Sequence, residues 1–265
     1  MIKIQMFSKI LGIFLLFFSI SMIIPITISI YYQEKNVFIF IKSFFFIFFS
    51  GLFLYMIGFY TKQELKNCDG FLVVFLIWIF LGISGSLPFL FLKNSNFDFS
   101  KSLFESISGL TTTGSTIITN FKNLPKSLLY YRQQLQFFGG IGIVVLAIAI
   151  IPIMEDEINL YKIENTDPMK NNQFYLKFYE KAKELWKIYL LLNFFCIIAY
   201  WAICKMNFFD AVSFAFSTIS TGGFSPYDQG INHYTSFTTH IISIIFMLLG
   251  SINFSLHYFF LKKKR

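Results

Sequence analysis

Charged residues are scarce in this sequence. Asp, Glu, Lys and Arg make up 14% of the 265 residues, whereas 55% are hydrophobic. Soluble domains carry about 25% charged residues, so the composition excludes the soluble class. Apolar runs long enough to cross a hydrocarbon core of ~30 Å as helices recur along the chain. The composition therefore predicts an all-α, polytopic membrane protein.

Cysteine is scarce as well. The three cysteines, Cys68, Cys196 and Cys204, lack metal-ligand spacing, and we interpret them as buried, inert thiols. No His, Cys or carboxylate cluster falls at the depth of a predicted span, and no stretch resembles a nucleotide-binding motif. We therefore expect neither an enzyme nor a bound cofactor.

The distribution of positive charge predicts the topology of the chain. The formal net charge is +8, and a nucleic-acid partner would be one reason for such an excess. If Met1 is cytoplasmic, however, most of the 22 basic residues, including Lys262–Arg265, fall on cytoplasmic segments. This is the bias that the positive-inside rule requires. We expect both termini in the cytoplasm, membrane lipid around the chain, and no nucleic-acid partner.

The hydrophobic pattern divides the chain into full spans and polar connectors. An opening hairpin, residues 1–66, has nothing polar in its middle, and Pro25 is expected to kink its first helix. Residues 154–183 form a charged cytoplasmic linker that contains an interfacial amphipathic helix. The predicted full spans cover residues 6–32, 37–60, 71–92, 133–153, 185–204 and 237–261.

Two short helices interrupt this pattern. Lys101–Leu110 and Asn207–Phe216 are too short to span a bilayer. Each leads into a segment rich in hydroxyl side chains and glycine, namely Ser106–Thr119 and Ser217–Ser225. Non-helical backbone at membrane depth is tolerated only where protein buries it or where it lines a watery cavity. The pattern therefore predicts two re-entrant segments, each a half-span helix followed by an extended loop.

After the hairpin, the chain thus contains one unit twice, in residues 67–153 and 184–265. The alignment of the two copies stays open, because Gly114 can be placed on either Gly222 or Gly223. Residues 121–132 are expected at the outer surface.

Two acidic residues sit in the short helices. Glu105 lies inside the first, where it pairs with a neighbour or faces a vestibule, and Asp210 is expected to cap the second. Gly139, Gly140 and Gly142 are interpreted as close-packing positions against the re-entrant segment.

Threonine and glycine in re-entrant loops suit a dehydrated monovalent cation. Such an ion needs substitute oxygens at fixed positions, and main-chain carbonyls supply them without a charge that would trap it. Glycine lets the backbone aim successive carbonyls inward. Each short helix also points the partial negative charge of its C-terminus at the cavity where the cation would lie.

These residues resemble a known family. Phe104–Thr116 is similar to the first pore loop of TrkH-type potassium-uptake subunits, Tyr131–Ala147 to the helix after it, and Phe216–Ser225 to the second pore loop. The resemblance implies the Trk/Ktr/HKT fold, with a hairpin and four membrane–pore-loop–membrane units around one pore. It also implies K+ as substrate, the bacterial inner membrane, a homodimer, and a cytosolic nucleotide-binding TrkA-like regulator. It implies ion coordination at Thr111, Thr112, Thr113, Gly114, Ser220, Thr221, Gly222 and Gly223.

The sequence departs from the family pattern in one respect, because it holds two of the four units. Two units cannot enclose the pore alone, and an open side would expose polar backbone to lipid. We expect a second polypeptide or a second copy of the chain to supply the missing units. The alternatives are a truncated remnant or a non-conducting membrane scaffold.

Overall fold

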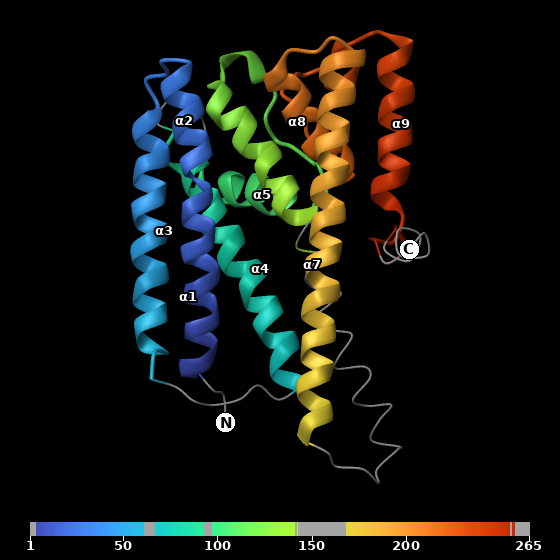
Figure 1. Ribbon diagram of the computed structural model, residues 1–265. Helices are drawn as coiled ribbons and strands as arrows, with labels where there is room; N and C mark the ends of the chain where they lie inside the picture. The colour runs from blue at the N-terminus through green and yellow to red at the C-terminus, as the bar shows by residue number, and fades with distance from the viewer. Residues whose placement is uncertain are drawn as a thin grey trace.

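The computed structural model describes residues 4–60, 67–92, 97–140, 142, 168–254 and 256–257, and within these ranges the regular elements are all helices (Figure 1). The segment expected as the start of the cytoplasmic linker, residues 154–167, lies outside them. One helix, which we call the central helix, covers residues 126–140. The others are α1 (Ile4–Ser21), α2 (Ile23–Tyr31), α3 (Val37–Ile57), α4 (Asn67–Leu90), α5 (Phe99–Leu110), α7 (Pro168–Ile198), α8 (Phe208–Ile219) and α9 (Phe237–Ser251), with short turns η1 (Phe121–Asn123), η2 (Ala199–Ile203) and η3 (Gly230–His233).

Four helical segments are long and apolar enough to cross a membrane: Ile4–Tyr31, Val37–Ile57, Leu72–Leu90 and Lys183–Ile203. The prediction of an all-α, multi-pass membrane protein is confirmed. The prediction of one helix over residues 237–261 is wrong, because α9 ends at Ser251 and the backbone becomes extended at Ile252, with φ −66° and ψ 136°. An uninterrupted apolar sequence does not show where a helix stops.

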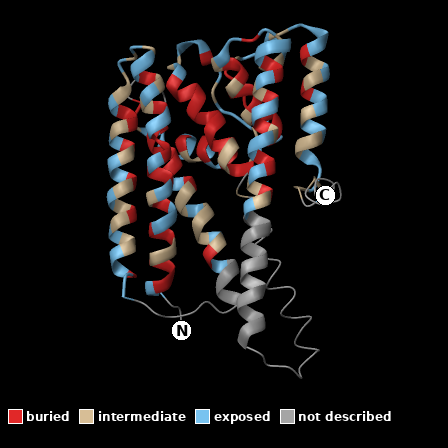
Figure 2. Ribbon diagram, viewed as in Figure 1, coloured by how far each residue is buried: buried red, intermediate tan, exposed pale blue. Residues whose placement is uncertain are grey.

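Burial follows the pattern of a protein in lipid (Figure 2). Large apolar side chains such as Phe38 and Phe53 are 71% and 66% exposed on outward helix faces. The buried set, in contrast, includes Glu105, Arg132 and Gln133. Polar groups in membrane proteins face the bundle interior, because hydrocarbon offers them no hydrogen bonds. The polar residues of this chain therefore mark its inside.

Helices α1 and α3 form the predicted N-terminal hairpin and run side by side (Figure 1). Their backbones approach closely at Gly12, where an added Cβ would lie 2.7 Å from the carbonyl oxygen of Gly51. Small residues at such crossings are how membrane helices gain van der Waals contact. The hairpin is thus a tightly packed unit.

Pro25 interrupts the first span, as predicted. A proline has no N–H to give to the carbonyl four residues earlier, which here is that of Ser21. The α1 helix ends at Ser21 and α2 begins at Ile23. The freed carbonyl of Ser21 instead accepts a hydrogen bond of 2.9 Å from the side-chain amide of Gln134 on the central helix. The hairpin is thereby joined to the middle of the molecule.

The central helix corrects part of the prediction that residues 121–132 lie at the outer surface, since residues 127–132 are buried. It begins at residue 126, and its residues 128–136 are buried. Glu34, in the turn between α2 and α3, accepts hydrogen bonds from the backbone N–H and the hydroxyl of Ser127, near the start of this helix. Lys122, Asn123 and Lys126 are exposed, whereas Ser127 and Arg132 are buried and find partners inside the protein. Composition alone does not separate these two cases.

Candidate functional site

The two half-span helices are present as predicted. Helices α5 and α8 each have 12 residues, so each is about 18 Å long, well short of a ~30 Å hydrocarbon core. Each ends in a non-helical segment, which we call loop 1 (residues 111–120) and loop 2 (residues 220–229). The predicted site residues are therefore the first four residues of each loop.

Backbone angles determine the alignment of the two units. Thr112 and Thr221 have φ of 54° and 52°, and Gly114 and Gly223 have φ of 76° and 81°. In both pairs the members are 109 residues apart, and the same offset superposes both ends of α5 on those of α8. Gly114 thus corresponds to Gly223, which answers the question that the sequence left open.

Both helices end in the same hydrogen-bonded turn. At the end of α5, the N–H groups of Thr112 and Thr113 donate to the carbonyls of Gly109 and Ser108, at 3.0 Å each. At the end of α8, Thr221 and Gly222 donate in the same way to Thr218 and Ser217, at 3.1 and 2.9 Å. This is the Schellman motif, whose left-handed residue is usually glycine.

Threonine occupies that left-handed position in both loops. A β-branched residue at positive φ is a genuine conformational outlier, and holding one there costs about 1–3 kcal/mol. Such strain persists where the surrounding structure enforces it, and it concentrates at functional sites. Its recurrence at Thr112 and Thr221 indicates a shared role for the two loops.

The two loops touch each other at Gly114. A Cβ added there would lie 1.8 Å from the carbonyl oxygen of Gly222, so only glycine allows this approach. The equivalent glycine, Gly223, has no atom of the described chain within 4 Å of its added Cβ. One edge of loop 1 is therefore covered by loop 2, while the matching edge of loop 2 is open.

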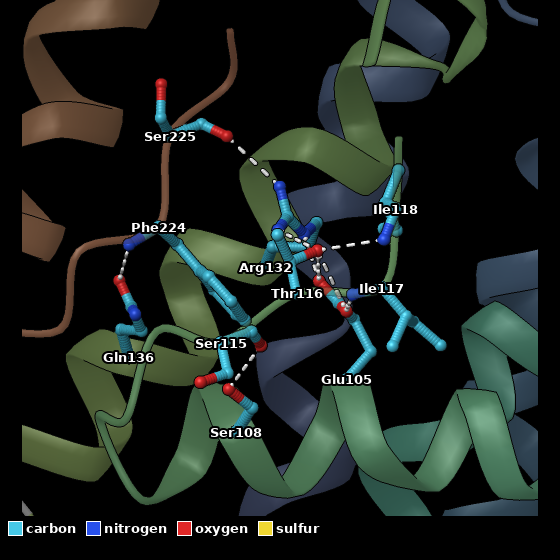
Figure 3. A network of polar contacts seen from close by, with 10 residues as sticks. All are labelled: Glu105, Ser108, Ser115, Thr116, Ile117, Ile118, Arg132, Gln136, Phe224 and Ser225. Atoms are coloured by element: carbon cyan, nitrogen blue, oxygen red, sulfur yellow. Dashed lines mark hydrogen bonds and ion pairs between the residues drawn. The ribbon is translucent and has the colours of Figure 1, made fainter. Parts of the chain in front are cut away.

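A buried ion pair lies beside the loops (Figure 3). The Nε atom of Arg132 donates to Oε1 of Glu105 at 2.7 Å, and the two side chains are 1% and 0% exposed. The hydroxyl of Thr116 in loop 1 also donates to both carboxylate oxygens of Glu105, at 3.0 and 3.1 Å. Of the two interpretations of Glu105, pairing with a neighbour is thus confirmed.

Arg132 reaches both loops with its remaining nitrogens. Its Nη2 donates to the Thr116 hydroxyl at 3.1 Å, and its Nη1 donates to the carbonyl oxygen of Ser225 in loop 2 at 3.0 Å. The guanidinium carbon lies 4.2 Å from the ring centroid of Phe224 and 4.5 Å from that of Phe121. One turn further along the central helix, Oε1 of Gln136 accepts from the N–H of Phe224 at 3.2 Å.

The roles of Arg132 and Gln136 were not predicted from the sequence. A usable signal is present, because Glu105 and Arg132 are opposite charges on either side of loop 1, between the apolar runs of the chain. Ionisable residues inside a membrane protein almost always pair with each other or with backbone. An Arg132 at the outer surface would have needed no buried partner, so the pair was not predicted.

Asp210 does not cap α8, contrary to the prediction. The N-cap of α8 is Asn207, and Asp210 lies in the first turn of the helix, where its carboxylate accepts from the hydroxyls of Tyr227 and Tyr234 at 2.9 and 2.5 Å. Burial, reinforced by this hydrogen bond, raises the pKa of Tyr227 to about 12. Asp210 therefore fastens the segment between Tyr227 and Tyr234 to α8.

Gly139 and Gly140 of the central helix are close-packing positions, as predicted. An added Cβ would lie 2.1 Å from the carbonyl oxygen of Leu110 at Gly139, and 2.6 Å from the hydroxyl of Tyr189 at Gly140. The central helix thus presses against the end of α5 on one side and α7 on the other. Among the described residues, no group of three or more His, Cys, Asp or Glu could hold a metal ion.

Two half-span helices with paired, strained loops define a class, that of membrane proteins built on repeated span–re-entrant-loop–span units. A family model for TrkH cation transport proteins matches residues 33–265. The chain belongs to this TrkH family.

Relatives and a solved structure agree with this assignment. The Trk system potassium uptake protein TrkH of Vibrio parahaemolyticus is 41% identical over 251 residues, which are 94% of this chain and 52% of that protein. TrkG of Escherichia coli K12 is 33% identical over 254 residues, 96% of this chain and 52% of that protein. The crystal structure of the potassium transporter TrkH from V. parahaemolyticus matches with a TM-score of 0.84 at 39% identity, over 97% of this chain and 52% of that one. The chain spans about half the length of the relatives it matches.

Proposed function

We propose that this chain is part of the ion-conducting subunit of a Trk-type potassium uptake system, with K+ as its substrate. The observation that carries the proposal is the repeated loop geometry, in which a strained threonine and a glycine occupy matching left-handed positions after each half-span helix. Relatives of this family are named potassium uptake proteins, which supports the choice of ion.

The backbone of each loop suits the coordination of a bare cation. In loop 1, φ is negative at Thr111 and positive at Thr112, and the sign alternates again up to Gly114. Such alternation turns successive carbonyls towards one side, where they can replace the hydration shell of an ion. The C-termini of α5 and α8 add partial negative charge. The proposed ligands are the backbone and hydroxyl oxygens of Thr111, Thr112, Thr113, Gly114, Ser220, Thr221, Gly222 and Gly223.

The open edge of loop 2 supports a pore that needs further loops. Gly114 packs against loop 2, and by the repeat the same surface of Gly223 would pack against a third loop. We propose that another polypeptide or a second copy of the chain supplies it. Placement in the bacterial inner membrane with cytoplasmic termini, and control by a TrkA-like regulator, are further parts of this proposal.

Potassium uptake in a deficient bacterial host tests the proposal. The chain is expressed alone, and then together with a polypeptide that carries the C-terminal half of TrkH from V. parahaemolyticus. We expect growth at limiting K+ and uptake of 86Rb+ in the combined strain. Growth from the chain alone would favour pairing of two copies, which a size measurement of the purified protein then checks.

Gly114→Val in the combined strain serves as the control for a conducting role. A valine there cannot fit against loop 2, so uptake should be lost when it is expressed per amount of protein present in the membrane. If neither strain takes up Rb+, or if Gly114→Val is as active as the unsubstituted chain, the remnant or scaffold alternatives replace the proposal.

A further inference from the structure

The central helix presents two polar side chains to the loops from one face. Arg132 and Gln136 are four residues apart, so they lie one above the other on the same side of the helix. Both are 0% exposed. They bind consecutive residues of loop 2, since Gln136 accepts from the N–H of Phe224 and Arg132 donates to the carbonyl of Ser225. Loop 2 is therefore held through its main chain, two residues beyond Gly222.

Arg132 also holds loop 1. Its contacts with Glu105 and with the Thr116 hydroxyl place one planar guanidinium between a pore-loop helix and both loops (Figure 3). The rings of Phe121 and Phe224 lie against the same group and exclude alternative positions. Because Glu105 neutralises the guanidinium, the arrangement adds no net positive charge next to the proposed cation path.

The repeat shows that this arrangement is not a general requirement of the fold. The offset of 109 residues places Glu105 on Phe214. The helix after each loop is offset by 111 residues, because α9 begins at Phe237 and Gly250 faces the carbonyl of Ile219 as Gly139 faces that of Leu110. Arg132 and Gln136 therefore correspond to Ser243 and Met247. Ser243 is buried and donates to the carbonyl oxygen of Thr239 on its own helix, and Met247 is 41% exposed. The second unit has the same loop turn without any of these polar residues, so the turn itself does not need them. What they serve is the placement of one loop relative to the other.

We propose that Arg132, assisted by Gln136, is a positioning residue that fixes the separation of loop 1 and loop 2 and thereby sets the preference of the pore for K+ over Na+. The ion-selectivity part rests on the function proposed above, whereas the positioning part does not. Carbonyl oxygens that replace the hydration shell of an ion must be held around it, and separating the two loops removes ligands from one side. The contact between Gly114 and Gly222 would otherwise be free to widen.

Arg132→Lys is the decisive variant. A lysine keeps the positive charge beside Glu105, so no charge is stranded, but its single ammonium cannot reproduce the planar fork that reaches Glu105, Thr116 and Ser225 together. Tyr131→Phe is the matched control, because Tyr131 is equally buried on the same helix but donates to Gly85 of α4 at 2.9 Å, away from the loops. Glu105→Gln combined with Arg132→Met removes the pair without leaving a lone charge.

Two measurements separate the parts of the proposal. Hydrogen–deuterium exchange on the purified chain should show at least a tenfold faster exchange in loop 2, at Phe224 above all, for Arg132→Lys and for the double variant. In the combined strain, competition of Na+ with 86Rb+ uptake should show the K+ preference reduced about tenfold, the change that ~1.4 kcal/mol of differential binding produces. Tyr131→Phe should change neither value.

Unchanged loop exchange in both variants would overturn the positioning role, and would leave the ion pair as a merely structural contact. Faster exchange with an unchanged ion preference would overturn the link to selectivity. If the unsubstituted chain supports no uptake with any partner, the proposed function fails, and the exchange measurement still decides whether Arg132 positions the loops.

Discussion

Gly114 and Gly223 form a natural matched pair for testing how the loops are assembled. Both have φ near 80°, at 76° and 81°, so alanine at either position meets the same left-handed strain of about 1–2 kcal/mol. The surroundings differ. At Gly114 the new Cβ would lie 1.8 Å from the carbonyl oxygen of Gly222, whereas at Gly223 no atom of the described chain lies within 4 Å.

This difference can be converted into an expected change in stability. A carbon and an oxygen normally stay ~3.3 Å apart or more, so Gly114→Ala must push the loops about 1.5 Å further apart. Forcing extra atoms into a packed site costs typically 1–3 kcal/mol. In the purified chain, Gly114→Ala should therefore destabilise by about 2–5 kcal/mol and Gly223→Ala by only about 1–2 kcal/mol.

Thermal unfolding in detergent measures this difference, because 1 kcal/mol shifts Tm by roughly 2–4 °C for a chain of this size. When the remaining pore units are supplied by a second polypeptide, Gly223→Ala should become as damaging to 86Rb+ uptake as Gly114→Ala. Equal Tm values for the two variants in the chain alone would refute the loop contact. Full uptake by a complex that carries Gly223→Ala would refute the proposal that a third loop packs against Gly223.

Two further predictions concern other polar contacts. Gln134→Leu should destabilise the chain by about 1–3 kcal/mol, because it leaves the Ser21 carbonyl buried without its donor. Adding Pro25→Ala restores a backbone N–H for that carbonyl and should recover most of the loss of Tm. If the Tm changes of the two single variants simply add in the double variant, the role given to Gln134 is contradicted. Tyr227 donates to Asp210, and the pKa of Tyr227 is raised to about 12 from the ordinary 10. Because the folded chain favours the neutral hydroxyl, the contribution of Tyr227 to stability is complete below pH 10 and is lost as the pH rises to 12. Unfolding temperatures measured between pH 9 and 12 should converge with those of Tyr227→Phe at the upper end, and parallel curves would contradict the assignment.

Length and patterning predicted most of the helices. The half-span helices were found because a short amphipathic run that leads into hydroxyl residues and glycine cannot continue as a full span. Their ends differ from the prediction by a few residues, since Phe99 and Ile219 extend the helices into segments whose composition does not distinguish helix from turn.

The sequence could not show which polar residues meet inside the protein. Arg132 looked like part of a surface segment, because its partners Glu105 and Ser225 are 27 and 93 residues away along the chain. Asp210 looked like a helix cap for a similar reason, as its hydroxyl partners follow in the next loop. Backbone angles at Thr112 and Thr221 were equally hidden, since threonine is a poor indicator of a left-handed turn.

The hydrogen bond from Gln134 to Ser21 also implies an order of events during membrane insertion. The two residues are 113 positions apart, and synthesis at ~5–20 residues per second separates them by roughly 6–23 s. During that interval the N-terminal hairpin occupies the bilayer with a peptide carbonyl that Pro25 has left unpaired, a costly state in hydrocarbon. Docking of the central helix removes that cost. The kink at Pro25 thus leaves an acceptor in the first helix for the central helix, which is synthesised later.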